Sequence, residues 1–127
     1  GFNIQILTNS PHPNGYLRVA CNSSSSKKQI NDAPVGGIST GTWHHIAATF
    51  NPTGGECIAY FNGVAIQQTL SNASIGHSDS WEFYIGAQKN SGGTNYTVDG
   101  QIKRVSIEQT VKSASELLAI YNAGHNS

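Results

Sequence analysis

The stretch from residue 43 to residue 63 constrains the fold more than any other part of the chain. Two apolar runs rich in strand-forming residues, Trp43–Phe50 and Glu56–Asn62, flank a polar turn with the sequence Asn51-Pro-Thr-Gly-Gly55. Proline cannot donate a ladder hydrogen bond, and glycine tolerates positive φ, so this turn predicts an antiparallel hairpin. The two runs therefore predict two neighbouring strands of a sheet.

A second turn signal extends this hairpin into a three-stranded meander. Asn62-Gly63 is typical of a type I′ turn and leads into a further strand at Val64–Thr69. Side chains alternate between the two faces of a strand, so alternate residues of each run share a face. We expect the core to take its side chains from such faces, with the following residues buried: Ile46, Phe50, Phe61, Phe83 and Ile85.

The remaining chain adds strands and one helix. Further strands are expected at Phe2–Leu7, Tyr16–Cys21, Lys27–Ala33, Trp81–Ala87 and Val98–Gln109, the first two as a hairpin. Ser113-Ala-Ser-Glu116 is a capping box, which predicts the start of a short helix. Its apolar stripe and its C-terminal cap are expected at Leu117, Ile120, Tyr121 and Gly124. Short strands separated by turn-forming residues and followed by one helix favour a β-sandwich.

Several short motifs carry a resemblance to a known family. The order is W-H-H-I-A at the start of the meander, Y-F-N-G ending at Gly63, Tyr84-Ile85-Gly86, Gly100-Gln101-Ile102 and Ser115-Glu116-Leu117. In this order they resemble the laminin-G-like, or concanavalin A-like lectin, family. The resemblance implies an all-β, two-sheet antiparallel jelly-roll sandwich with one short C-terminal helix. It also implies that the chain lacks the N-terminal strands of complete family members.

The length of 127 residues predicts one domain over residues 1–127, and the absence of Met indicates a domain excised or processed from a larger protein. Seven basic residues balance seven acidic ones, which argues against nucleic acid or an anionic membrane as the partner. No apolar run is long enough to cross a bilayer, so no membrane insertion is expected. Abundant Ser, Asn, Thr and Gly favour an extracellular or surface-displayed domain, secreted or on a virion.

Two cysteines, Cys21 and Cys57, both fall in expected strands. Cysteine is often a small buried hydrophobe, and in an oxidising setting two such residues can also form a disulfide. The sequence leaves both alternatives open.

The distribution of acidic residues argues against an enzyme. A glycosidase needs two carboxylates across a cleft, and catalytic relatives on this fold place E-x-D-x-E along one strand. No such motif occurs here, because the seven acids are scattered: Asp32, Glu56, Asp79, Glu82, Asp99, Glu108 and Glu116. His44 and His45 are adjacent on an expected strand and would point to opposite faces, which is poor geometry for joint metal binding. A nucleophile–base pair of His45 and Cys57 lacks an orienting acid, so a structural histidine is favoured.

Calcium is the one cofactor that the family resemblance raises. Many relatives hold it on a rim with an acid that follows the Ile of a G-x-I-D-E pattern, whereas here Lys103-Arg104 follow Ile102. We therefore expect no cofactor. If calcium is bound, Asp79 and Asp99 are the residues expected to hold it.

Recognition of a ligand is the function that remains. Sugars bind to aromatic faces framed by hydrogen-bonding side chains, and two groups supply that mixture: His77, Asp79 and Trp81 before one expected strand, and Asn90, Asn95 and Tyr96 after it. They should emerge at opposite ends of that strand, so a single shallow site uses one group. We favour the Trp81 side, because His77, Asp79 and Trp81 lie within five residues and offer a donor, an acceptor and a stacking face. The alternative for Trp81 is an aromatic that closes the core, and Trp43 is expected to be a core residue.

The leading hypothesis is a non-catalytic glycan-binding or adhesion module of an extracellular or surface protein. The alternative is a structural, assembly or receptor-binding domain of an extracellular or viral or phage fibre or spike that contacts protein. The expected partner is thus carbohydrate or a surface protein. Because single shallow sugar sites bind weakly, we expect a homo-oligomer or a multidomain parent.

Overall fold

The computed structural model describes residues 2–7, 15–22, 27–32, 37–76, 84–89 and 95–125. Contacts divide the chain into two compact units. The first, here the sandwich unit, comprises Gly1–Gly76 and Thr110–Ser127, and the second, the hairpin unit, comprises His77–Gln109.

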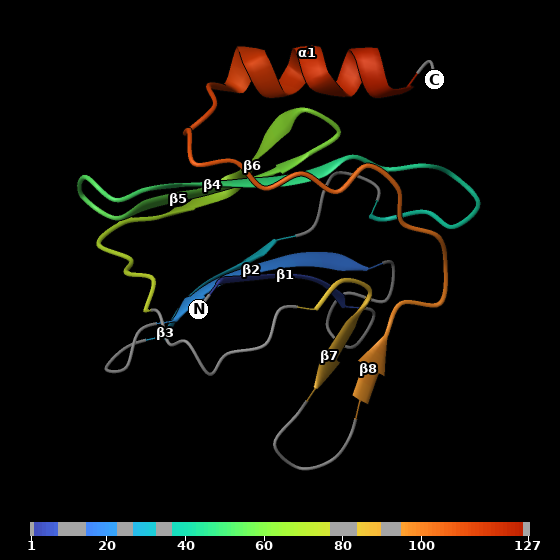
Figure 1. The fold of residues 1–127 in the computed structure, drawn as a ribbon, viewed down its shortest axis with the longest axis horizontal. Helices are drawn as coiled ribbons and strands as arrows, with labels where there is room; N and C mark the ends of the chain where they lie inside the picture. Colours follow the sequence, from blue (N-terminus) through green and yellow to red (C-terminus); the bar gives the residue numbers. More distant parts are fainter. Residues whose placement is uncertain are drawn as a thin grey trace. The chain divides into compact units, whose positions relative to one another are not determined.

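Two antiparallel sheets form the body of the sandwich unit (Figure 1). The first sheet has the order β1-β2-β3, with β1 at Phe2–Leu7, β2 at Tyr16–Asn22 and β3 at Lys27–Asp32. The second has the order β4-β5-β6, with β4 at Ile46–Asn51, β5 at Glu56–Phe61 and β6 at Val64–Leu70. The expected first hairpin and the expected meander are both confirmed.

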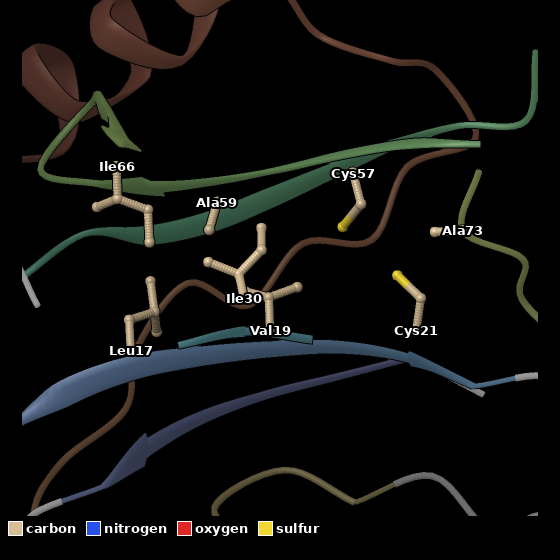
Figure 2. Close-up of a cluster of buried hydrophobic side chains, with 8 residues drawn as sticks. All are labelled: Leu17, Val19, Cys21, Ile30, Cys57, Ala59, Ile66 and Ala73. Atoms are coloured by element: carbon tan, nitrogen blue, oxygen red, sulfur yellow. The ribbon is translucent and has the colours of Figure 1, made fainter. Parts of the chain in front are cut away.

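The core lies between these two sheets (Figure 2). Strand β2 contributes Leu17, Val19 and Cys21, which are at most 1% exposed, because alternate residues of a strand face the same side. They meet residues from the opposite sheet and its flanks, namely Cys57, Ala59, Ile66 and Ala73, with Ile30 of β3 beside them. Burying a side chain such as Leu17 stabilises the fold by about 1.5–3 kcal/mol relative to leaving it exposed.

Three residues expected in the core lie at its margin. Ile46, Phe50 and Phe61 pack against the buried cluster but are only partly buried. Ile46 and Phe50 belong to β4, which pairs with β5 alone among the described strands, so its other flank has no ladder neighbour there. Phe61 stands directly opposite Ile46 at the end of the same ladder. Partial burial follows from the edge position of β4 for Ile46 and Phe50, and from the position at the end of the ladder for Phe61.

The turns of the meander need glycine at two points. Gly55 has φ 64°, and an added Cβ there would overlap the backbone of Ala73, whose N–H donates to the Gly55 carbonyl at 2.9 Å. In the β5–β6 turn Asn62 and Gly63 have φ 50° and 77°, so both central residues are left-handed, as a type I′ turn requires. These contacts attach the turns to segments that are distant in the sequence.

Helix α1, Ala114–His125, lies against the second sheet on the side away from the first sheet (Figure 1). The expected capping box is confirmed, because the Ser113 N–H donates to Glu116 Oε2 at 2.7 Å and the Glu116 N–H donates to Ser113 Oγ at 3.3 Å. No helix in the described residues is long and apolar enough to span a membrane.

The expected apolar stripe and C-terminal cap of this helix need correction. Leu117 is buried, but Ile120 is 41% exposed. The helix touches the sheet near Gly63, where an added Cβ would lie 2.9 Å from Leu118 Cα and 3.1 Å from Tyr121 Cβ, and this close approach leaves Ile120 to one side. Gly124 does not end the helix, which continues to His125.

The hairpin unit contains β7 at Ala87–Lys89 and β8 at Asn95–Thr97, which pair antiparallel. A strand was expected at Trp81–Ala87, but of its described residues, 84–87, only Ala87 belongs to a strand, as the first residue of β7. Gly86 has φ 77°, which interrupts a strand and places the ladder after it. Ile85 is 55% exposed and is not a core residue, whereas Phe83 lies outside the described residues.

The strand expected at Val98–Gln109 is also wrong. These residues form no regular ladder, and Arg104 has φ 58°, a left-handed conformation that a β-strand excludes. The apolar side chains that suggested the strand are exposed, with Ile102 at 48%, Val105 at 52% and Ile107 at 73%.

Candidate functional site

Most of the ligand-binding residues expected from the sequence lie outside the described part of the chain. This holds for His77, Asp79, Trp81 and Asn90. Asn95 and Tyr96 belong to β8, where their backbones pair with Lys89 and Gln88, but their side chains are outside what is described. The binding site around Trp81 or Tyr96 therefore stays a prediction.

The expected calcium residues have a similar outcome. Asp79 lies outside the described residues, and Asp99 is exposed in the segment that follows β8. Within the described ranges, no three His, Cys, Asp or Glu side chains lie close enough together to hold a metal ion. The expectation of no cofactor, with Asp79 and Asp99 as the residues that would hold calcium if it is bound, therefore stays a prediction.

A different group of polar and aromatic side chains comes together at the start of β4. We call it the Trp43 cluster; its members are Trp43, His44, His45, Phe61, Asn62 and Tyr121. Trp43 is 44% exposed, so the expectation that it is a core residue is wrong. Strand β4 begins only at Ile46, and Trp43 therefore precedes the ladder instead of lying between the sheets.

Asn62 fixes the position of the segment that carries Trp43. Its backbone N–H donates to the His45 carbonyl at 2.8 Å, and its side-chain Oδ1 accepts from the His45 N–H at 2.9 Å. Asn62 can do this because it occupies a left-handed position of the β5–β6 turn, which asparagine tolerates better than most residues. The chain before β4 is thus held by two hydrogen bonds to the neighbouring turn.

His44 is held on the core side of this segment. Its Nε2 lies 2.9 Å from the Ser39 carbonyl, and its Nδ1 lies 3.4 Å from Asn62 Nδ2. A neutral ring protonated on Nε2 satisfies both contacts, since Nε2 then donates and Nδ1 accepts. The ring also packs on Phe61, with centroids 4.9 Å apart and planes inclined by 34°.

His45 points the other way, toward helix α1. Its ring centroid is 6.1 Å from that of Tyr121. Its Nδ1 is buried without a hydrogen-bond partner, and burial lowers the pKa of the ring, so the neutral form is favoured. The expectation that the adjacent histidines face opposite sides is confirmed by these partners, Phe61 for one ring and Tyr121 for the other.

These contacts decide what the cluster can do chemically. The ring nitrogens of His44 are used within the protein, and His45 is turned toward the helix while Cys57 faces the core (Figure 2). The His45–Cys57 pair is therefore on opposite faces of the sheet and is no nucleophile–base pair. The cluster leaves Trp43 44% exposed, and an indole is a flat apolar group suited to stacking.

Two described carboxylates are engaged near their own positions in the chain. Glu108 accepts a hydrogen bond from the Ser106 hydroxyl at 3.1 Å. The Ser113 backbone N–H and then its hydroxyl hold the pKa of Glu116 below its usual value. Both residues are exposed and have local structural partners.

The chain matches a protein-family model over most of its length. The family model described as the concanavalin A-like lectin/glucanases superfamily matches residues 1–118. The chain belongs to this superfamily. The concanavalin A-like fold agrees with the expected all-β sandwich of two antiparallel sheets with one short C-terminal helix.

A solved structure supports this concanavalin A-like fold. The chain is similar to a crystal structure of an S-layer domain-containing protein (residues 221–444) from Clostridium thermocellum ATCC 27405, with a TM-score of 0.58 and 19% identity. The match covers 95% of this chain but 63% of that one, so the chain spans less than two thirds of that structure. A search of curated proteins found no match.

Sequence reasoning missed the Trp43 cluster because it assigned Trp43 to the central strand. One signal was present: Asn62 is the first residue of a type I′ turn pair, and its side chain is free to bond a neighbouring backbone. The hydrogen bond between Asn62 and His45 joins residues far apart in the sequence, so local residue patterns predict neither it nor the start of the β4 ladder beside it.

Proposed function

We propose that this domain is a non-catalytic carbohydrate-recognition module of an extracellular or surface protein. The observation that carries the proposal is the exposed indole of Trp43, in a segment fixed by the hydrogen bonds between Asn62 and His45. Stacking on a sugar needs a flat aromatic face that stays in place, and a segment already ordered loses less entropy on binding. Membership of a superfamily that contains lectins supports the same proposal.

The absence of catalysis is part of this proposal. Glycoside hydrolysis needs an acid and a second carboxylate on opposite sides of the bond. Of the described acids, Glu108 and Glu116 bond to serines of their own segments. The sequence also lacks the E-x-D-x-E strand motif. Both facts support recognition without turnover.

A single stacking site of this kind is weak. Shallow sugar sites have dissociation constants on the order of millimolar, about −4 kcal/mol. We therefore propose that binding in use is multivalent, through several copies of the domain or a larger parent protein. Trp81 with His77 and Asp79 is a second proposed stacking site, and a calcium ion at Asp79 and Asp99 would belong to that region.

A glycan array tests the proposal, with the domain displayed in several copies on a particle. Wild type should be retained on a subset of glycans, and Trp43→Ala should lose most of that retention while its melting temperature stays nearly unchanged. Trp81→Ala, measured in parallel, tells which of the two indoles binds. Tyr84→Ala is the matched control, because Tyr84 is an aromatic with a similar exposure of 43% in the other unit.

Two results would contradict the proposal. One is a wild-type domain that binds no glycan even when displayed in several copies. The other is retention that neither tryptophan substitution reduces.

A second candidate function is assembly through protein contacts, and strand β1 favours it. β1 pairs with β2 alone among the described strands, so one of its edges has no ladder neighbour there. Its residues Phe2, Ile4 and Ile6 stand opposite core residues of β2, yet they are 39%, 41% and 44% exposed. An apolar row on an edge strand is typical of a surface that pairs with another chain.

Sedimentation velocity separates this candidate from glycan binding. If β1 mediates assembly, wild type should associate at micromolar concentration and Ile4→Thr, which keeps strand propensity, should not. If wild type stays monomeric at all concentrations, self-assembly through β1 is excluded and the glycan proposal is unaffected.

A further inference from the structure

The two cysteines face each other across the core of the sandwich unit. Cys21 lies on β2 and Cys57 on β5, the middle strands of the two described sheets. They are 1% and 0% exposed, and Figure 2 shows their sulfur atoms pointing toward one another. Both are free thiols in this structure.

We propose that Cys21 and Cys57 are a redox site that closes as a disulfide between the two sheets. The oxidant is a disulfide, either a small molecule or a thiol–disulfide oxidoreductase. One cysteine thiolate attacks a sulfur of that disulfide, forming a mixed disulfide and releasing one thiolate. The second cysteine then displaces the other half, so the Cys21–Cys57 bond forms and the oxidant leaves as two thiols, which take up the two protons that the cysteines lose.

The bond needs the two sheets to come closer together at the cysteines. A disulfide needs Cα atoms about 4.4–6.8 Å apart, whereas stacked sheets ordinarily lie about 10 Å apart. Ala59 and Ala73 are small members of the core cluster near the cysteines (Figure 2), whereas Phe50 and Leu70, the ladder neighbours of Cys57, are large side chains that also pack against this cluster. Closing the bond therefore requires the side chains beside Cys57 to shift as the sheets approach.

Burial determines when the bond forms. The hydrogen bond between the two thiols lowers the pKa of Cys21 and, together with burial, raises the pKa of Cys57, so Cys21 supplies the thiolate that reacts in exchange. Both sulfurs are also inaccessible to an oxidant in the folded protein. Oxidation should therefore occur during folding or transient opening, and the folded reduced protein should react slowly.

The bond would constrain the unfolded chain strongly. It closes a loop on the order of 35 residues, which lowers the entropy of the unfolded state more than a short loop does. For a domain of this size the expected increase in melting temperature is about 10 °C. The proposal is independent of ligand binding, because neither cysteine belongs to the Trp43 cluster.

The test compares oxidised and reduced wild-type protein. The full chain is unfolded in denaturant and refolded in a buffer of oxidised and reduced glutathione, then examined by thiol titration under denaturing conditions and by intact mass. We expect no free thiol, a monomer lighter by two hydrogen atoms, and a melting temperature about 10 °C higher than after reduction.

Cys21→Ala and Cys57→Ala are the controls, since each leaves one cysteine and should show a melting temperature that does not respond to reductant. The main comparison uses wild type in both redox states and so does not depend on either variant folding. Two free thiols after redox refolding would overturn the proposal, as would a covalent dimer in place of the internal bond, or an internal bond that lowers the melting temperature.

Discussion

Val19 and Val105 are the same residue in two different settings. Val19 stands in β2 between ladder partners Ile4 and Ile30, faces the second sheet and is fully buried. Val105 lies in an apolar stretch of the hairpin unit that forms no ladder, and it is 52% exposed. Val19 is buried because ladder neighbours flank it and an opposing sheet covers it, whereas Val105 has no ladder neighbour.

The glycines of the two units differ in the same way. Gly55 in the sandwich unit is buried against the backbone of Ala73, whereas Gly86 in the hairpin unit would bring an added Cβ only to the tip of Ile102, at 3.4 Å. Both have positive φ, at 64° and 77°. A left-handed backbone conformation, which glycine adopts without strain, is thus common to the two positions, and crowding is present only at Gly55.

The largest expected effect comes from this pair of glycines. Gly55→Ala should destabilise the protein by about 3 kcal/mol, because the new methyl group meets backbone that cannot move aside and also occupies a left-handed position. Gly86→Ala should cost about 1 kcal/mol, since only the φ strain applies. Urea unfolding measures both values. Equal losses would show that crowding at Gly55 is relieved by a small shift of the turn.

The two valines give the next effect. Val19→Ala should cost about 2 kcal/mol in urea unfolding, from lost burial and the cavity left behind. Val105→Ala should change stability by less than about 0.5 kcal/mol, as expected of an exposed site. A cost at Val105 as large as that at Val19 would mean that this stretch is buried in solution.

Substitutions at two serines compare the stability contributed by a helix cap with that contributed by a hydrogen bond in a loop. Ser113→Ala removes the hydroxyl that accepts from the Glu116 N–H and should lower stability by about 1 kcal/mol. Ser106→Ala removes only an exposed bond to Glu108 and should be nearly neutral. Thermal melts followed by circular dichroism at a helix-sensitive wavelength measure both variants. If Ser113→Ala is as neutral as Ser106→Ala, packing alone starts the helix.

The smallest effect is a pH dependence from His45. Burial lowers the pKa of its ring in the folded state, so as the pH falls below the ordinary histidine value of about 6.5 the unfolded chain takes up a proton first. Stability should therefore decrease as the pH falls from about 6.5 until the folded ring is also protonated, and should be level above that range. His45→Gln should flatten this slope in urea unfolding at several pH values. A slope unchanged in His45→Gln would place its origin elsewhere.

The parts of the fold that the sequence predicted well are those specified by adjacent residues. The meander follows from the turn residues between its strands, and the cap of helix α1 follows from Ser113 and Glu116, three positions apart. Hydrogen bonds between residues so close in the sequence can be predicted from the local pattern of residue types. The same is true of the hairpin of β1 and β2.

The parts that were wrong depend on residues far apart in the chain. Ile102, Val105 and Ile107 have strand propensity, but propensity does not supply a ladder partner. Trp43 has the composition of a core residue, and its exposure follows from a ladder that starts three residues later, beside Asn62. The ligand site around Trp81 is still a prediction from composition.

The close contact of Gly63 with helix α1 has a consequence for the order of folding. Gly63 and Leu118 are about 55 residues apart in sequence, so bringing them together closes a long loop, whereas each turn of the meander closes only a few residues. We expect the meander to form before the transition state and the helix to dock after it. Ser113→Ala should then speed unfolding and leave the folding rate nearly unchanged, which stopped-flow kinetics can measure. During synthesis the meander would accordingly form before helix α1 docks on it.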